Sequence, residues 1–471
     1  MGIAGLVLAA VAIQAGQAPP RHPQPLPDPA AAPVRVEVRV TTAARTVRLF
    51  LRDPDHVLLV ADARLTSGSA AAHAAIEDGG VLALTGNPEG STAVATFRVV
   101  LASDAATSVR FGVGIAPFVR PATIEVFNVN DEARPTSVAS AVDAVSGAEI
   151  EASMAPLRAG GPLTIPRRDR LVLAHYYPWW EPVAWASPQL LDQPLKLYST
   201  DIAAEVAANL KDVRAAGIDA VIVSYQGSDV GGGWNLRRLR YVLDGAQQAG
   251  LKVSVQLETL AANRVGLEGA PPDPDVLTTW IVELVDTMAT HPAWLKVDGR
   301  PVIFAYVWGY AGDDTWRGVL SRVRAGGRNP LMMADSTNPA HLSLADGLAT
   351  YSGTLFAEDV HALVRDTVSA ARAWHLLGSA YGSPRIAAAT VMPGYDETRL
   401  LGRSGRAVSR ESGEFYDRQW EAALASGTDW VVISTWNEWA ENTEVEAGQR
   451  FGQFYVWRTQ FWTAALKHAP R

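Results

Sequence analysis

An apolar run that changes at once into aromatic and acidic residues, WVVISTWNEWAE, occupies positions 430–441. Its first four residues form a near-continuous apolar segment, which is typical of a strand in a parallel sheet with both faces covered. We predict a strand over residues 430–436, so that Asn437, Glu438 and Glu441 follow the end of the strand. Because the active sites of α/β barrels lie at the carboxyl ends of their strands, this stretch bears on both the fold and the site.

The same alternation of strand and helix patterns extends upstream from this stretch. Predicted strands cover residues 171–177, 220–225, 251–258, 302–307, 331–335, 347–351, 385–391 and 430–436. Predicted helices cover residues 201–216, 234–249, 274–290, 314–323, 358–375, 411–425 and 451–468. Eight strands that alternate with helices within residues 165–471 predict an α/β fold, a (β/α)8 TIM barrel. A doubly wound open sheet is the alternative, but no Gly-x-Gly-x-x-Gly turn follows the first strand.

Residues 34–150 follow a different pattern, with apolar residues at every second position. Val34, Val36, Val38 and Val40 alternate with charged residues, as in half-buried strands. About seven such strands are expected without helices between them, at residues 34–40, 47–51, 57–60, 81–84, 93–100, 108–115 and 123–129. This count and spacing predict an all-β immunoglobulin-like sandwich, either an accessory domain or a structural spacer.

The first 33 residues have the composition of a targeting segment followed by a spacer. The apolar run from Ile3 to Ile13 is too short to cross a bilayer, which needs roughly 20 residues. We interpret residues 1–18 as a signal peptide, and expect a secreted or periplasmic protein with no stable membrane span. Prolines at seven positions within residues 19–33 favour an extended linker.

Composition excludes several classes of function. The formal net charge of -8 and the lack of a Lys/Arg run argue against nucleic acid as a partner. The absence of cysteine excludes disulfides, thiolate zinc sites and a cysteine nucleophile. Neither a His-Glu-x-x-His metal motif nor a Gly-x-Ser-x-Gly nucleophile motif occurs in the sequence. We therefore expect no cofactor and no metal, and chemistry carried by carboxyl groups.

Aromatic, carboxyl and amide side chains gather where the predicted barrel strands end. They are His175, Tyr177 and Trp179 on strand one, Tyr225 on strand two, Glu258 on strand three, Tyr306 on strand four, Tyr395 on strand seven, and Trp436, Asn437, Glu438, Trp439 and Glu441 on strand eight. Aromatic rings stack on the apolar faces of sugars, while carboxylates, amides and phenols bind sugar hydroxyls. This composition predicts a carbohydrate substrate. For His175 and the tyrosines, packing in the core is the alternative interpretation.

Glu438 and Glu441 form the sharpest chemical pattern in the chain. Glycoside cleavage needs one carboxyl group that protonates the leaving oxygen and one carboxylate that acts as base or nucleophile. If the segment turns helically, the two side chains lie on one face with Cβ atoms about 5–6 Å apart, and their pKa values separate. This arrangement disfavours inversion, which needs carboxyl groups roughly 6.5–9.5 Å apart on opposite faces of the sugar. A solvated acidic loop is the alternative.

These residues resemble glycoside hydrolase family 99 and its family 99-like relatives, the endo-α-mannosidase group. The resemblance covers roughly residues 171–462 and rests above all on residues 436–446, WNEWAENTEVE. Weaker motifs are YYPW at residues 176–179, VQLE at 255–258, GRP at 299–301 before Tyr306, and PGYD at 393–396.

The resemblance implies a (β/α)8 barrel that needs no metal and hydrolyses α-mannosidic links within a chain, with retention of configuration. It implies that Glu438 acts as a base on the substrate's own 2-hydroxyl group, and that Glu441 acts first as an acid and then as a base. By the same resemblance Glu258 binds sugar hydroxyls, and Tyr177, Tyr306 and Tyr395 line the cleft.

The surroundings of the glutamates differ from the family pattern. Ala440 stands where family members typically have His, Asn442 where they have Gly, and Gln256 and Thr259-Leu260 replace the His and Pro-aromatic that flank the third-strand Glu. The resemblance therefore supports the type of reaction more strongly than the identity of the substrate. Two other functions remain open at this stage: a non-catalytic carbohydrate-binding barrel, and a protein of surface-polysaccharide assembly.

Overall fold

The computed structural model describes most of the chain after residue 33. The described residues are 34–51, 57–77, 81–102, 108–116, 120–129, 134–153, 169–228, 233–263, 271–351, 360–374, 385–403 and 405–469. The predicted signal peptide (1–18) and linker (19–33) lie outside them, as does most of the predicted junction between the two domains.

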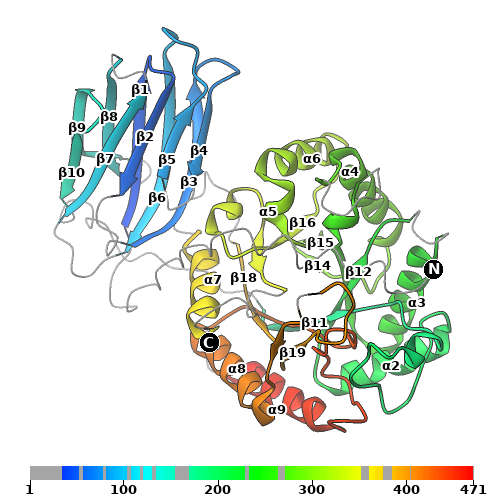
Figure 1. Cartoon of the computed structure of the whole chain (residues 1–471). Helices are drawn as coiled ribbons and strands as arrows, with labels where there is room; N and C mark the ends of the chain where they lie inside the picture. Colours follow the sequence, from blue (N-terminus) through cyan, green and yellow to red (C-terminus); the bar gives the residue numbers. More distant parts are fainter. Residues whose placement is uncertain are drawn as a thin grey trace.

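The N-terminal part consists of ten strands in two antiparallel sheets, drawn in blue to cyan in Figure 1. One sheet has the strand order β3-β6-β1-β8-β9 and the other β10-β7-β2-β5-β4. The strands are β1 (Val34–Thr42), β2 (Thr46–Leu51), β3 (Val57–Ser67), β4 (His73–Glu77), β5 (Val81–Thr85), β6 (Ala93–Ala102), β7 (Ser108–Ala116), β8 (Ala122–Asn128), β9 (Thr136–Ala144) and β10 (Glu149–Ser153).

The period-two pattern positions the core of these sheets. Val36, Val38 and Val40 are at most 1% exposed, while Glu37 on the opposite face accepts hydrogen bonds from Arg39 and Arg98. The sequence missed β4, β9 and β10, because β9 in particular has small, mostly exposed residues and no apolar alternation. Antiparallel sheets are thus confirmed, whereas the immunoglobulin-like connectivity stays a prediction.

The second part is a closed barrel of eight parallel strands, which confirms the predicted (β/α)8 fold (Figure 1). The ring is continuous, because β11 pairs with β21 at Leu171–Trp430 and β13 pairs with β15 at Val255–Ile303. The strands are β11 (Leu171–Tyr176), β12 (Ala220–Tyr225), β13 (Lys252–Leu257), β15 (Arg300–Ala305), β16 (Leu331–Asp335), β17 (Gly347–Ala349), β18 (Ile386–Val391) and β21 (Trp430–Ile433). The short β14 (Lys296–Val297) is antiparallel to β15, and β19 (Tyr395–Asp396) pairs with β20 (Ala407–Val408).

Helices surround the barrel at the predicted places. They are α2 (Ala203–Ala215), α3 (Trp234–Ala249), α4 (Pro274–Glu283) with a π-helical extension (Leu284–Met288), α5 (Trp308–Ala311), α6 (Asp313–Ala325), α7 (Val360–Trp374), α8 (Glu414–Ser426) and α9 (Phe454–His468). Short 3-10 turns occur at η3 (Ala184–Ala186), η5 (Thr259–Ala261), η7 (Pro339–Ser343) and η11 (Glu411–Gly413). In the described part of the chain no helix is long and apolar enough to span a membrane.

Apolar side chains fill the interior of the barrel. Leu173, Ile222, Phe304 and Met333 form part of one buried cluster inside the ring of strands. Gly347 is required in this interior, since a Cβ atom there would lie 2.6 Å from the sulfur of Met333. The polar residues described below follow the carboxyl ends of the strands.

Candidate active site

The loop after β21 folds back on itself and carries both glutamates. Beyond Ile433 the backbone pairs within the loop, where Thr435 N–H donates to Thr443 O at 2.9 Å and Val445 N–H donates to Thr435 O at 3.0 Å. The predicted strand 430–436 therefore ends at residue 433. Between these pairs the chain forms a tight turn rather than a continuing helix, and Asn442 adopts a left-handed conformation with φ 51°. Asn and Gly tolerate that conformation best, which explains an Asn here.

Neighbouring loops hold this turn in place. The guanidinium of Arg410 donates to Glu444 O and to Asn442 O, both at 2.9 Å. The side-chain amide of Asn442 donates to Asp396 O at 3.0 Å. Residues of the loops that follow β18 therefore hold this turn in place through hydrogen bonds.

The two glutamates are buried in unequal environments. Glu438 is 2% and Glu441 6% exposed. Glu438 Oε1 accepts one backbone hydrogen bond, from Ala440 at 3.1 Å. Burial, and then the charge of Glu441, raises the pKa of Glu438 well above its usual range.

Glu441 has stronger support for its negative charge. The Tyr351 hydroxyl donates to Glu441 Oε2 at 2.8 Å, the Tyr395 hydroxyl donates to Oε1 at 3.4 Å, and Arg403 lies 3.5 Å from Oε1. Burial raises the pKa of Glu441, but Arg403 and the tyrosine donors oppose that rise. The environment thus separates the pKa values of the two carboxyl groups. In the site without substrate, it stabilises the carboxylate form of Glu441 better than that of Glu438.

Two further carboxyl groups, both half-buried, come from neighbouring strands. Glu258 accepts hydrogen bonds from Ser224 Oγ at 2.8 Å and Gln256 Nε2 at 3.3 Å, and burial raises its pKa to about 7. Asp335 accepts from the backbone N–H groups of Val307 at 3.0 Å and Tyr351 at 2.9 Å, and burial raises its pKa to about 6. Asp335 therefore joins the loops after β15 and β17.

Buried tyrosines lie between these carboxyl groups. Tyr177, Tyr306 and Tyr351 form one cluster, in which the Tyr306 and Tyr351 rings meet edge to face at 5.6 Å. Burial raises the pKa of Tyr177, and the charges of Glu258, Glu438 and Glu441 raise it further. Since these interactions link β11 with the ends of β13 and β21, the predicted residues Tyr177, Tyr306, Tyr395, Glu258, Glu438 and Glu441 belong to one site.

Trp179 borders the tyrosine cluster and has a free donor. Its ring contacts that of Tyr177 at a centroid distance of 4.5 Å. Its indole N–H is buried and has no hydrogen-bond partner among the described residues. Buried polar groups are normally paired, so this N–H is available to a ligand oxygen.

Three residues of the site escaped the sequence-based prediction. Tyr351 lies at the end of the predicted strand 347–351. Its position at a strand end, which also identified Tyr306, could have revealed it. Arg403 and Glu397, whose side chains are 2% and 0% exposed, form a buried ion pair at 3.3 Å in the loops around β19 and β20. No local pattern marks these two residues.

Two predicted contact residues point away from the site. The Tyr225 hydroxyl donates to Glu283 at 3.1 Å and its ring packs on Trp280, so Tyr225 lies in the outer layer between β12 and α4. Trp436 likewise donates its indole N–H to Asn209 Oδ1 on α2 at 3.0 Å. Successive strand residues face opposite sides, and Ser224, which contacts Glu258, takes the inward position next to Tyr225.

Two other predicted residues, Asn437 and Trp439, have structural partners. Asn437 accepts from Tyr177 N–H at 2.7 Å and donates to Tyr177 O at 3.1 Å and to the Tyr198 hydroxyl at 3.0 Å, so its side chain joins the ends of β11 and β21. Trp439 donates to Glu446 at 3.1 Å and packs in a separate aromatic cluster with Trp180 and Trp185.

His175 is an interior histidine. Its ring contacts those of Tyr351 and Phe304 edge-on, at centroid distances of 5.1 and 6.4 Å. Burial lowers its pKa to about 3, which keeps the imidazole neutral. Its observed role is to support Tyr351 from inside the barrel.

No group of three or more His, Asp or Glu in the described ranges is arranged to hold a metal ion. The side chains around Glu438 and Glu441 are phenols, carboxyls, an indole and one guanidinium. Such a set suits proton transfer and the binding of hydroxyl groups.

Comparison with known proteins identifies the family of this chain. The model of glycosyl hydrolase family 99 matches residues 193–451, more than half of the chain. The chain belongs to glycosyl hydrolase family 99. The family match includes Glu258, Glu438 and Glu441, together with Ala440 and Asn442.

Individual proteins are similar to this chain at sequence identities below 25%. Two proteins named glycoprotein endo-alpha-1,2-mannosidase match, one from Xenopus laevis at 24% identity over 58% of this chain, and one from Rattus norvegicus at 24% over 53%. The chain spans only 58% and 54% of the lengths of these relatives. The structure of the GH99 endo-alpha-mannosidase from Bacteroides thetaiotaomicron is similar in fold, with a TM-score of 0.50, 22% identity, and coverage of 64% of this chain and 98% of that one.

Proposed function

We propose that this family 99 protein is a retaining, endo-acting glycoside hydrolase that cleaves α-mannosidic links in a poly- or oligosaccharide. The observation that carries the proposal is the pair Glu438 and Glu441, two buried carboxyl groups on one turn at the end of β21. Their positions within one turn favour retention, because inverting enzymes need carboxyl groups roughly 6.5–9.5 Å apart on opposite faces of the sugar. The names of the two mannosidase relatives support the choice of sugar.

The reaction proceeds in two steps that balance without a cofactor. First, Glu438 accepts the proton of the substrate's 2-hydroxyl group, O2 bonds to C1, and the C1–oxygen bond to the leaving sugar breaks. Glu441 donates its proton to that leaving oxygen. In the second step water attacks C1 of the 1,2-anhydro sugar, Glu441 accepts the water's proton, and Glu438 returns its proton to O2. Both carboxyl groups are then in their starting states, and the configuration at C1 is retained.

The productive state needs a charged Glu438 and a protonated Glu441. In the free site the electrostatics favour the opposite distribution, because Arg403 and Tyr351 support a negative charge on Glu441. A substrate 2-hydroxyl group that donates to Glu438 stabilises the carboxylate form and lowers the pKa of Glu438. Substrate binding therefore favours a charged Glu438 and a protonated Glu441, as expected for two carboxyl groups that interact.

The other side chains of the site supply sugar contacts. Glu258 provides a half-buried acceptor, and the phenols of Tyr177 and Tyr306 provide hydroxyl groups beside it. Trp179 adds an aromatic face and a buried N–H without a partner. These groups match a sugar, which presents apolar C–H faces and hydroxyls together.

A change of leaving group tests the two roles. An α-mannosyl fluoride needs little protonation at its leaving atom, so its first step does not depend on Glu441. Glu441→Gln should therefore lose much less activity on the fluoride than on an α-mannan, and the loss on the fluoride reflects the role of Glu441 as the base in the second step. Glu438→Gln should be inactive on both. Glu421→Gln, at an exposed position on α8, is the matched control. Loss of the fluoride reaction in Glu441→Gln alone would reverse the roles, and no turnover by the wild type would favour a non-catalytic carbohydrate-binding barrel.

We also propose that the chain is exported and that residues 34–150 form an immunoglobulin-like accessory module. The apolar run from Ile3 to Ile13 supports export, and a substrate outside the cell is consistent with it. Mass spectrometry of the protein recovered outside the cytoplasm tests export, because removal of residues 1–18 should leave a chain that begins at Pro19.

A further inference from the structure

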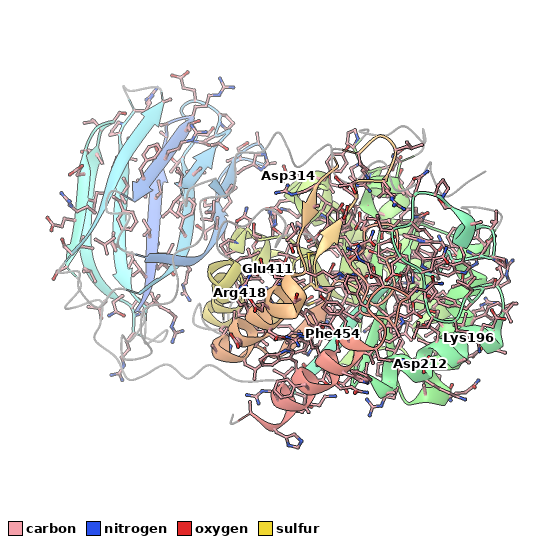
Figure 2. The ribbon with its side chains drawn as sticks, turned by 60° about the horizontal axis from the view of Figure 1, so that its bottom comes forward. Lys196, Asp212, Asp314, Glu411, Arg418 and Phe454 are labelled. Carbon is pink, nitrogen blue, oxygen red and sulfur yellow. The ribbon has the colours of Figure 1, made fainter. Side chains whose placement is uncertain are left out.

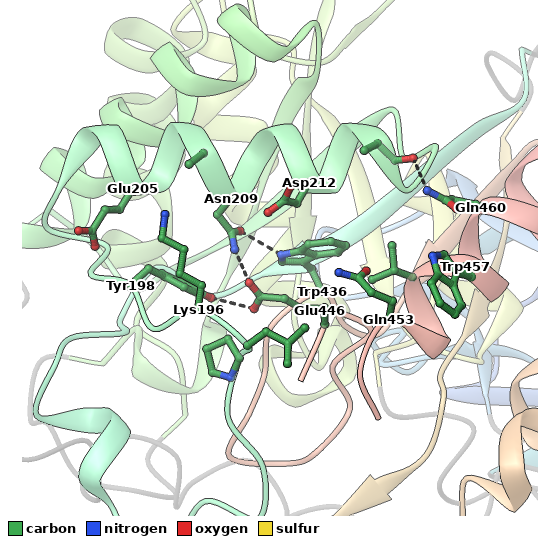
Figure 3. A pocket seen from close by; sticks show the side chains of 16 residues that line it. Lys196, Tyr198, Glu205, Asn209, Asp212, Trp436, Glu446, Gln453, Trp457 and Gln460 are labelled. Carbon is green, nitrogen blue, oxygen red and sulfur yellow. Dashed lines mark hydrogen bonds between the residues drawn. The ribbon is translucent and has the colours of Figure 1, made fainter. Parts of the chain in front are cut away.

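A cavity of about 310 Å³ lies on the outer wall of the barrel, between α2, the segment before it and α9 (Figure 3). This volume falls at the lower end of the range for ligand pockets, roughly 300–1,000 Å³. None of the proposed catalytic carboxyl groups lines the cavity. Figure 2 shows two of its residues, Lys196 and Asp212, close together on the barrel surface.

The floor of the cavity is a satisfied polar network. Glu446 accepts hydrogen bonds from the Tyr198 hydroxyl at 3.0 Å and from Asn209 Nδ2 (Figure 3). It also accepts one from Trp439 Nε1 at 3.1 Å. Asn209 in turn accepts from Trp436 Nε1. Trp436 and Glu446 flank the turn that carries the catalytic pair, so the cavity lies behind that turn.

The walls of the cavity, in contrast, carry polar groups that are exposed to solvent and open to a ligand. Lys196, Asp212 and Gln453 make no side-chain hydrogen bond with any described residue, although all three line the cavity. They offer an ammonium donor, a carboxylate acceptor and an amide with both functions. Partial burial raises the pKa of Asp212, while the nearby Lys196 opposes that rise.

An exposed indole completes the wall. Trp457 on α9 is 64% exposed and lines the cavity beside Leu195, which is 55% exposed. Exposed aromatic rings next to free hydrogen-bonding groups suit a sugar ring, whose C–H face packs on the indole while its hydroxyls bind the polar groups. The lining carries the carboxyl groups of Asp212 and Glu205, which disfavour an anionic ligand, and the ammonium of Lys196, which disfavours a cationic one. A neutral ligand fits this mixture of charges.

We propose that this cavity is a second saccharide-binding site, which holds a neutral hexose unit of a polysaccharide chain away from the catalytic pair, with Trp457 as its stacking surface and Lys196, Asp212 and Gln453 as its hydroxyl ligands. The choice of a mannan as ligand rests on the proposed function. The proposal of a second site depends only on the cavity, the exposed indole of Trp457 and the polar side chains on its walls.

Affinity electrophoresis in gels that contain soluble α-mannan tests the site in the full chain. Glu438→Gln serves as the parent, so that the polymer stays intact. Trp457→Ala in this background should weaken retardation about fivefold to tenfold, and Asp212→Asn should weaken it as well. Phe461→Ala is the matched control, because Phe461 lies one turn further along α9 and is 65% exposed but does not line the cavity. It should migrate like the parent.

The second measurement separates this proposal from the proposed function. Trp457→Ala with an intact catalytic pair should hydrolyse a short α-mannooligosaccharide as fast as the wild type. If the wild type hydrolyses the oligosaccharide but Trp457→Ala is retarded by mannan as strongly as its parent, the second site is refuted. Equal losses in Trp457→Ala and Phe461→Ala would also refute it. If the wild type hydrolyses no mannoside, the proposed function fails instead.

Discussion

Removal of one hydroxyl group, by Tyr351→Phe, should shift the titration of the catalytic pair. This hydroxyl donates to Glu441 Oε2 at 2.8 Å in a buried site, and the change leaves the aromatic ring in place. A hydrogen bond to a charged group contributes about 1.5–3 kcal/mol, and one pKa unit corresponds to about 1.36 kcal/mol. The loss could therefore raise the pKa of Glu441 by about 1–2 units. We expect about one unit, because Arg403 and Tyr395 still support the charge.

The assay is the pH dependence of kcat/KM on an α-mannooligosaccharide. The donor favours the charged form of Glu441, so its removal can only raise the apparent pKa values of the coupled pair. At least one limb of the profile should move upward by about one unit, and neither limb should move downward. Tyr416→Phe is the control, since this buried hydroxyl bonds Thr459 at 3.0 Å, outside the site. An unchanged profile, or a limb that moves to lower pH, would refute the assignment of this hydrogen bond to the reacting pair.

Other consequences concern stability and domain structure. Arg403→Gln leaves buried carboxylates without their cation, so the free energy of unfolding in urea should fall by about 3–5 kcal/mol and activity should be lost. Burial raises the pKa of Glu258 to about 7 and that of Glu446 to about 8, so the folded state binds more protons than the unfolded state between those values and about 4.5. The melting temperature in scanning calorimetry should therefore fall as pH rises from about 5 to about 8, and Glu258→Gln should reduce that slope. A fragment of residues 161–471 should remain folded by circular dichroism, whereas aggregation of the fragment would contradict the predicted boundary.

The sequence predicts the barrel well because its strands are long apolar segments. Strands β12 and β16 and helix α3 have the predicted boundaries, β11 is one residue shorter at its C-terminal end, and β13 is one residue shorter at each end. Errors are larger where the chain leaves the barrel, as in the predicted strand 430–436. There the backbone of Thr435 pairs with the returning loop, and nothing local in the sequence indicates that partner.

The site is predictable in part for the same reason. Reading the residues at strand ends identifies Glu258, Tyr306 and Glu438, because parallel strands bring their ends together. The position of a residue at a strand end does not give the direction of its side chain. The prediction therefore wrongly includes Tyr225, which faces α4. Arg403 could not be found in this way, because it reaches Glu441 through a long loop whose path depends on tertiary contacts.

The anomeric configuration of the first product, followed by proton NMR during hydrolysis of an α-mannooligosaccharide, bears on the whole mechanism. With Glu438 and Glu441 on one turn, the wild type should release the α-anomer first, and Glu441→Gln should release no product from the same substrate. Initial release of the β-anomer, or equal turnover by Glu441→Gln, would contradict a retaining reaction carried by this pair.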